Sequence, residues 1–409
     1  MTSEGKANIA LVGAGWWSQG WHLPSLSRNP ACKIAAIVDT SEHPKSNLNP
    51  DLEPLSALQK KYEAKIFSSV DKMLADQEVG PKLDGCIIAT PHATHYAVGR
   101  QIMAEIDRRR KEEPSSSGKT AKPLHILMEK PLSTHMDHAL SIYKLVQDHD
   151  GSSQFWINHS ANFRKQTMLA RQAIESGKIG SVKHITAFFA SHLTSIFADP
   201  ANKGWNEPDD GMLGNGFAWG QSSHLFAWLF HVCPDLQPTD VFCSMVHSAK
   251  TGADVSHSAT IRCKKGTSNS DDDQEEFSVL SVSGTSLLPG DAHSDPPVGK
   301  QIQIKIFGSD GALLYQGDDR NPNSGQLELR DPSGRVEVLH PEFVFENLDH
   351  DGLGPESLQN FVQLCAGNSK DDIYVGANVT DGLRTIQVIE AMYRSQHSQR
   401  QEQVRMPEK

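Results

Sequence analysis

The sequence predicts an α/β protein of two domains: an N-terminal doubly wound parallel sheet over 1–155, and a C-terminal α+β domain over 156–409 with a large, mostly antiparallel open sheet. Two observations predict this architecture. In the first domain, short apolar runs alternate with helix-like stretches, which is typical of strand–helix–strand units. After Thr167, the later runs are rich in β-branched and aromatic residues, and no helical stretch separates them. A chain of 409 residues is long enough for both hydrophobic cores.

The individual elements follow from the same patterns. The strands expected in the parallel sheet are Ile9–Val12, Lys33–Val38, Lys65–Ser68, Leu83–Thr90, Leu124–Met128 and Gln154–Asn158. Those expected in the second sheet are Val182–Phe189, Val241–Val246, Ala259–Cys263, Phe277–Val282, Gln301–Phe307 and Val336–Leu339. We expect helices over Leu169–Ser176 and Asn378–Ser395, the second of which carries an apolar stripe. Polar stretches within 105–122, 264–276, 289–300 and 317–325 indicate loops or insertions.

Charge and composition exclude several classes of partner. The formal net charge is −11, which disfavours a general nucleic-acid or anionic-membrane surface. No apolar run approaches transmembrane length, and the polar first residues do not indicate a signal peptide. The six cysteines are scattered without a CxxC spacing, which favours free thiols in a reducing compartment over a zinc site. We therefore expect a cytoplasmic protein without metal, membrane or nucleic-acid partners.

A glycine-rich turn follows the first predicted strand. The segment Gly13-Ala14-Gly15-Trp16-Trp17-Ser18 lies between an apolar run and a predicted helix start. In a Rossmann dinucleotide site, the first two glycines permit a tight turn and close approach of the pyrophosphate to a helix N-terminus. The third position of the G-x-G-x-x-G pattern holds Ser18, a small residue that still allows packing. We expect Gly13, Gly15, Trp16 and Trp17 to line a dinucleotide site, because the variable positions of the loop can face the cofactor.

An acidic residue ends the second predicted strand. Asp39 directly follows Ile34-Ala35-Ala36-Ile37-Val38. A carboxylate at this strand end can accept hydrogen bonds from the ribose hydroxyls and repels the 2′-phosphate of NADP. The sequence therefore favours NAD over NADP as cofactor.

Two further strand ends point to the same edge of the sheet. The run Ile87-Ile88-Ala89-Thr90-Pro91 precedes His95, and we expect Thr90, Pro91 and His95 to border the cofactor. The run Leu124–Met128 ends in Glu129-Lys130-Pro131, where Pro131 makes the chain leave the strand. Ligands of open α/β sheets bind at the carboxyl ends of the strands, so Glu129 and Lys130 are expected beside the dinucleotide.

These motifs resemble one family in their order and spacing. They are similar to the glucose–fructose oxidoreductase, inositol dehydrogenase and rhizopine-catabolism (Gfo/Idh/MocA) oxidoreductases. Segments 162–164, 174–180, 301–314 and 381–395 extend the resemblance over most of the chain. The resemblance implies a Rossmann domain joined to a domain with a large open sheet, NAD(P)-dependent oxidation or reduction of a secondary alcohol of a sugar, cyclitol or related polyol, and a homodimer or homotetramer.

The resemblance also implies the catalytic residues. Lys130 matches the family lysine that stabilises the developing alkoxide, and His224 in Gly220-Gln221-Ser222-Ser223-His224 matches the histidine of a D-x-x-x-H element that acts as acid and base. Gly220 stands in the place of the aspartate, which is the main departure from the family pattern. Gln221 cannot replace its negative charge, whereas Asp209 or Asp210 could approach from the preceding loop. We expect Lys130, Arg164, Gln221 and His224 to contact the substrate.

Two other readings remain open at this stage. Gly220 in place of an acid is compatible with a catalytically silent NAD(P)-sensing protein on the same fold. A glycoside hydrolase or lyase that uses bound NAD transiently is the third possibility. An ordinary glycosidase is disfavoured because no pair of carboxylates has an informative spacing.

Overall fold

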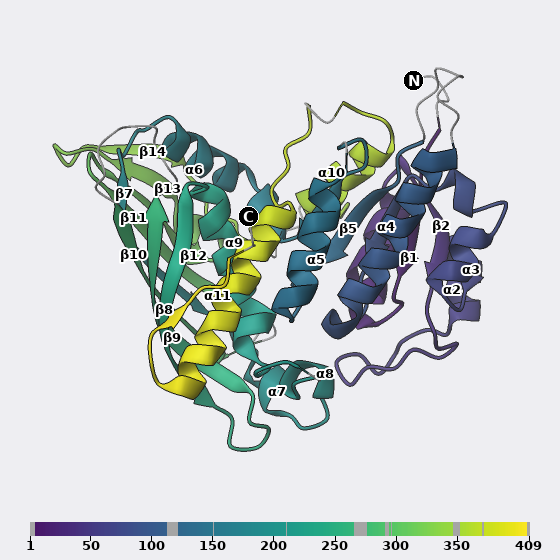
Figure 1. Ribbon diagram of the computed structural model, residues 1–409, viewed down its shortest axis with the longest axis horizontal. Helices are drawn as coiled ribbons and strands as arrows, with labels where there is room; N and C mark the ends of the chain where they lie inside the picture. The colour runs from purple at the N-terminus through teal and green to yellow at the C-terminus, as the bar shows by residue number, and fades with distance from the viewer. Residues whose placement is uncertain are drawn as a thin grey trace. The chain divides into compact units, whose positions relative to one another are not determined.

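The structure is a computed structural model that describes residues 5–112, 122–149, 151–209, 211–265, 276–290, 294–295, 297–346, 352–369 and 372–406. The chain forms two compact units (Figure 1). The first unit contains the described parts of Met1–Ser133, Asp137–Asn158 and Asp349–Thr380. The second contains the described parts of Thr134–Met136, His159–Leu348 and Asp381–Lys409. A late segment of the chain thus belongs to the first unit, beyond the boundary near residue 155 that the sequence suggested.

The first unit is built on a six-stranded parallel sheet. Its strands have the order β3-β2-β1-β4-β5-β6, and every neighbouring pair is parallel. They are β1 (Ala7–Val12), β2 (Cys32–Val38), β3 (Lys65–Phe67), β4 (Gly85–Ile88), β5 (His125–Glu129) and β6 (Phe155–Asn158). All six predicted strands are present, and the doubly wound parallel sheet is confirmed. Parallel strands buried on both faces account for the near-continuous apolar runs in the sequence.

Helices connect and cover these strands. They are η1 (Ser18–His22), α1 (Leu23–Arg28), α2 (Leu55–Tyr62), α3 (Val70–Ala75), η2 (Gly80–Lys82), η3 (His92–Thr94), α4 (His95–Glu112), α5 (Met136–Gln147) and α10 (Glu356–Cys365). Sequence patterns did not predict α10. It packs closely on β4, since a Cβ added at Gly85 would lie 2.5 Å from Cys365 Sγ and 2.9 Å from Phe361 Cζ. Burial of its apolar face against the sheet, rather than a strong local signal, stabilises this helix.

The second unit is built on a nine-stranded sheet of order β14-β13-β12-β11-β7-β10-β9-β8-β15. Within this second sheet, the β7–β10 pair is parallel and the other pairings of its described strands are antiparallel. The strands are β7 (Val182–Ala190), β8 (Leu236–His247), β9 (Asp254–Lys265), β10 (Phe277–Thr285), β11 (Gln301–Gly308), β12 (Ala312–Asp318), β13 (Leu327–Arg330), β14 (Val336–His340) and β15 (Glu402–Gln403). The predicted large, mostly antiparallel sheet is confirmed, although β13 and β15 were not anticipated.

The second unit also contains helices and short helical turns. They are η4 (Ser160–Phe163), α6 (Lys165–Glu175), α7 (Thr194–Ala198), α8 (Lys203–Asn206), η5 (Ala218–Ser222), α9 (Ser223–Val232), η6 (Pro322–Ser324) and α11 (Val379–Ser398). The helices expected over Leu169–Ser176 and Asn378–Ser395 correspond to α6 and α11. Side chains alternate between buried and exposed along β8 to β11, as a sheet with one covered face requires. Every residue of α9 is buried.

The predicted polar stretches have mixed outcomes. The centres of two of them, 113–121 and 266–275, lie outside the described residues, as does Asp210. The stretch 317–325 is not a plain loop, since β12 extends to Asp318 and η6 follows. Among the helices that the structure describes, none combines the length and apolar composition needed to cross a bilayer.

Candidate active site

The glycine turn after β1 shows two different requirements for glycine. Gly13 has φ 96°, and a Cβ there would lie 2.6 Å from the carbonyl oxygen of Ala89. The fold itself therefore demands glycine at position 13. A Cβ at Gly15 would meet no protein atom within 4 Å. The open space at position 15 fits the close approach of a dinucleotide pyrophosphate to the backbone, and contact of Gly15 with a cofactor remains a prediction.

Side chains around the turn hold it in place. The Ser18 hydroxyl donates a hydrogen bond to the Gly13 carbonyl, with an oxygen–oxygen distance of 2.5 Å. The residue in the third motif position therefore connects the start of η1 to the turn. Asp39, at the end of β2, accepts from the amide of Ala14 through Oδ2 at 2.8 Å and from the amide of Ser41 through Oδ1 at 2.9 Å. The carboxylate thus lies directly beside the turn. Its contact with a ribose remains a prediction.

Glu129, the last residue of β5, is a buried anchor. Its Oε1 atom lies 2.9 Å from Trp17 Nε1, 2.8 Å from His22 Nε2 and 2.7 Å from Asn158 Nδ2. Burial by itself raises the pKa of this carboxyl, but His22 and Asn158 outweigh burial and lower the pKa to about 2. Glu129 therefore joins η1, β5 and β6 through one ionised oxygen, a holding role that the sequence did not indicate. Cofactor contact by Glu129 stays a prediction.

His95 joins two of the strand ends. Its Nδ1 lies 2.8 Å from the Pro131 carbonyl, and its Nε2 lies 3.0 Å from the Thr90 carbonyl. The ring is buried, and burial lowers its pKa. His95 can thus position the segments after β4 and β5, where Thr90, Pro91 and Lys130 lie. Direct contact of these residues with a cofactor is not tested.

Lys130 directly follows β5 and is partly buried. In the strand order β1-β4-β5, this strand lies two positions away from β1, which carries the glycine turn, with β4 between them. Trp16 and Trp17 also lie at this edge, with ring centroids 5.3 Å apart, and Trp17 is 36% exposed. The first unit therefore presents a glycine turn, a tryptophan face and a lysine at one edge of its sheet.

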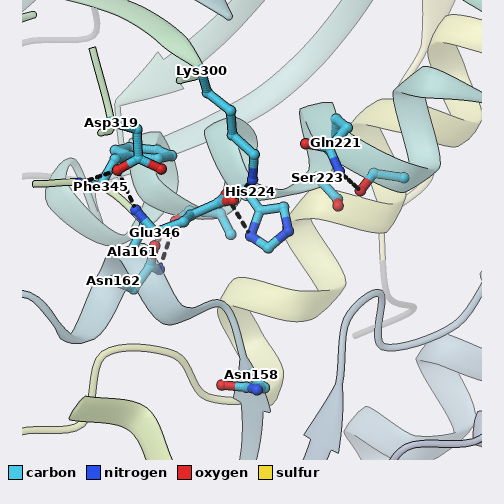
Figure 2. A network of polar contacts seen from close by, with 12 residues as sticks. Asn158, Ala161, Asn162, Gln221, Ser223, His224, Lys300, Asp319, Phe345 and Glu346 are labelled. Atoms are coloured by element: carbon cyan, nitrogen blue, oxygen red, sulfur yellow. Dashed lines mark hydrogen bonds and ion pairs between the residues drawn. The ribbon is translucent and has the colours of Figure 1, made fainter. Parts of the chain in front are cut away.

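In the second unit, His224 meets an acid that sequence reasoning missed. His224, the second residue of α9, has Nδ1 2.9 Å from Glu346 Oε1. The other oxygen of Glu346 pairs with the Lys300 amine. Figure 2 shows the Glu346 carboxylate beside both groups. All three side chains are close to fully buried. Burial raises the pKa of the Glu346 carboxyl, but His224 and Lys300 together hold it well below its usual range.

The backbone that carries Glu346 is fixed from two sides. Asp319 Oδ1 accepts from the amides of Phe345 and Glu346, each at 2.8 Å, and burial raises the pKa of Asp319 to about 6. Arg164, also buried, donates to the carbonyls of the same two residues at 3.3 and 2.8 Å. Arg164 was predicted as a substrate contact; the structure gives its guanidinium these backbone partners, and substrate contact is untested.

The remaining residues that the sequence singled out are Gln221, Asp209 and Asp210. Gln221 is buried; its Nε2 donates to the Gly220 carbonyl at 3.1 Å, and its Oε1 has no hydrogen-bond partner among the described residues. Asp209 is exposed, and Asp210 is not described. The sequence left open that one of these aspartates approaches His224; among the described residues, the acid that pairs with His224 is Glu346. The one available signal was the apolar run Phe343-Val344-Phe345 ending in an acid, the pattern that had singled out Glu129.

Both halves of the chain match one protein family. Residues 7–106 match the Gfo/Idh/MocA oxidoreductase family with its NAD-binding Rossmann fold, and residues 167–314 match the Gfo/Idh/MocA C-terminal domain. The fold and these matches define the class as an NAD(P)-binding oxidoreductase. The chain belongs to the Gfo/Idh/MocA family, and the resemblance drawn from its motifs is confirmed.

Individual relatives are distant. The D-xylose 1-dehydrogenase (NADP+) of Haloarcula marismortui is 20% identical over 216 residues, which cover 53% of this chain and only about half, 51%, of that protein. The WlbA dehydrogenase from Bordetella pertussis, solved with NADH and UDP-GlcNAcA, is 19% identical with a TM-score of 0.64 over 98% of this chain and 99% of that one. An oxidoreductase from Agrobacterium radiobacter, solved with NAD+, L-tartaric acid and magnesium, is 14% identical with a TM-score of 0.65 over 97% and 98% of the two chains. At such identities, the solved structures show a shared fold.

Proposed function

We propose that this protein is an NAD-dependent dehydrogenase that oxidises a secondary alcohol of a sugar, cyclitol or related polyol, or reduces the corresponding carbonyl. The observation that carries the proposal is the position of Lys130 at the carboxyl end of β5. The open space beside Gly15 lies at the same end of the sheet. A cation beside a dinucleotide is what stabilises negative charge developing on an alcohol oxygen. Two of the relatives named above, a D-xylose dehydrogenase and a dehydrogenase solved with UDP-GlcNAcA, support a carbohydrate substrate.

The proposed roles follow from the chemistry of alcohol oxidation. A bound nicotinamide cofactor would supply the acceptor for the hydride that leaves the carbinol carbon. The hydroxyl proton goes to His224, whose Nδ1 faces Glu346, so Nε2 is the nitrogen that takes it. Lys130 lowers the pKa of the alcohol and stabilises its oxygen as the carbonyl forms. In the reverse direction His224 returns the proton. Gln221 Oε1, buried and still an available acceptor, is proposed to receive a substrate hydroxyl.

The cofactor preference is proposed from Asp39. Its carboxylate lies against the Ala14 amide, at the strand end where a ribose is expected. A negative charge there repels a 2′-phosphate, which favours NAD, although the xylose dehydrogenase relative uses NADP. We expect Asp39→Ala to raise the KM for NAD and to lower the NAD-to-NADP ratio of kcat/KM by roughly 10-fold or more.

The apolar outer face of the second sheet supports the proposed homo-oligomer. Strand register places Phe242, Val279, Phe307 and Val338 on one face, each between 38% and 47% exposed. Exposed apolar side chains gathered on one surface are typical of a protein interface. Light scattering after size-exclusion chromatography tests for a homodimer or homotetramer.

The six cysteines are buried free thiols, which supports the proposed cytoplasmic location.

The decisive experiment is NADH formation by purified protein with NAD across a panel of sugars, cyclitols and sugar acids. Lys130→Met and His224→Ala are expected to lower kcat/KM roughly 100-fold or more. Lys33→Met is the matched control, since Lys33 is an exposed lysine near the opposite end of the first sheet. Lys130→Met with unchanged turnover contradicts the proposal.

The same panel separates the other two readings. Tight NADH binding without turnover on any substrate indicates a sensor, and glycoside cleavage without net NADH indicates transient redox chemistry. The missing aspartate at Gly220 was the feature that favoured a sensor. Glu346 beside His224 weakens that argument, because a carboxylate is present after all.

A further inference from the structure

We infer that Glu346, flanked by Lys300, does for His224 what the absent acid at position 220 does in the D-x-x-x-H element: it fixes the ring tautomer and stabilises the protonated ring. Glu346 is thus a positioning residue for the acid/base step. The inference rests on the proposed catalytic role of His224. It concerns residues of the second unit alone.

The first support is steric. A Cβ added at Gly220 would lie 2.9 Å from Phe197 Cζ, 3.0 Å from Phe197 Cε1 and 3.6 Å from Trp205 Cε3. Phe197 is fully buried, so its ring cannot move aside freely. Aromatic rings therefore occupy the space that an aspartate side chain on η5 needs. An acid for His224 has to come from another segment of the fold.

The second support is that hydrogen bonds to Asp319 fix the backbone that carries Glu346. Strand pairing of Gln301 with Asp318 sets Lys300 beside Asp319 at one end of β11 and β12, and the Asp319 amide donates to the Lys300 carbonyl at 2.9 Å. Asp319 then holds the amide of Glu346 at 2.8 Å. One strand end thus fixes both the acid and its cation. A carboxylate that merely filled space would not need this support.

The third support is the charge arrangement. Among the described residues of this unit, the charged or titratable groups that face His224 include Glu346, with Lys300 behind it, and His159, whose ring centroid lies 5.6 Å away at an interplanar angle of 89°. Arg164 and Asp319 meet the Glu346 segment through its backbone. Glu346 favours imidazolium, whereas Lys300 neutralises part of that effect. The two residues therefore have opposite influences on the same histidine.

The opposite influences define the experiment. Ring titration of His224 is followed by NMR on histidine-labelled protein, with the His224→Gln spectrum as assignment. Glu346→Gln is expected to lower the pKa of His224 by about one unit or more, and Lys300→Met to raise it. The pH profile of kcat/KM is expected to shift in the same two directions, with a loss of roughly 10-fold or more in Glu346→Gln. Glu337→Gln, which removes an exposed acid that pairs with Lys178, is the matched control.

Several outcomes remain distinct. If Glu346→Gln does not fold, two other variants test the inference. One is Lys300→Met, and the other is the double variant Glu346→Gln/Lys300→Met, in which neither residue is left as an unpaired buried charge. Titration of His224 that is unchanged in all of these variants overturns the inference. If His224→Ala keeps full turnover, the proposed function fails, even when the Glu346 and Lys300 variants shift the pKa of His224 in the NMR titration. If His224→Ala is inactive but Glu346→Gln titrates and reacts like wild type, the inference alone fails.

Discussion

The ring of Phe197 lies where a side chain at Gly220 would stand, with 2.9 Å between Phe197 Cζ and the Cβ position. We expect Gly220→Asp, which restores the family residue, to destabilise the protein by about 1–3 kcal/mol because it overpacks a buried aromatic contact. It is also not expected to raise kcat/KM. Urea unfolding and steady-state kinetics check both points. A stable, faster Gly220→Asp variant contradicts the steric explanation.

Alanine at Gly13 is predicted to lower stability, whereas alanine at Gly15 is predicted to lower cofactor affinity. Gly13→Ala meets the Ala89 carbonyl at a positive φ, so it is expected to lower the free energy of unfolding by roughly 1–3 kcal/mol. Gly15→Ala meets no protein atom, so its stability is expected to change by less than about 0.5 kcal/mol while NADH affinity falls. Thermal unfolding without cofactor and NADH fluorescence titration separate the two effects. Equal affinity for NADH in wild type and Gly15→Ala would show that no ligand approaches that position.

Glu129 is predicted to make stability depend on acid pH. Its folded pKa of about 2 lies below the ordinary glutamate value of 4.5, so its stabilising contribution is complete above pH 4.5 and is lost as the pH falls toward 2. Glu129→Gln is expected to lower the free energy of unfolding by roughly 3 kcal/mol at pH 7, with a difference from wild type that shrinks below pH 4.5. Denaturant unfolding across this range is the measurement. Glu78→Gln, an exposed acid, is the control and is expected to show no such trend.

Asp319 is predicted to have the opposite pH dependence. Burial raises its folded pKa from 3.8 to about 6, so its contribution to stability is complete below pH 3.8 and is lost as the pH rises through about 6. Asp319→Asn cannot ionise but keeps an acceptor for the Phe345 and Glu346 amides. Its stability relative to wild type is expected to increase by roughly 2–3 kcal/mol between pH 4 and pH 7. Parallel pH profiles of the two proteins would contradict this assignment.

Local sequence patterns predicted the parts of the site that depend on neighbouring residues. The glycine turn, Asp39 and Lys130 could be located because each directly follows an apolar strand, and strand ends of a parallel sheet gather at one edge. Helix α10 and strand β13 were missed, because they are stabilised by packing against distant elements and carry weak local signals. Glu346 follows an apolar run, but its role was missed because no spacing rule connects it with His224.

The sequence by itself determined the family, the two sheets and the positions of Gly13, Gly15, Asp39 and Lys130. These features are local, because backbone conformation and hydrophobic periodicity act over a few residues. Only the tertiary structure decided which acid meets His224, how Asp319 and Lys300 support that acid, and why Gly220 is glycine. Such contacts join residues far apart in the chain, and they arise from the packing of a sheet end against buried helices, which no local pattern encodes.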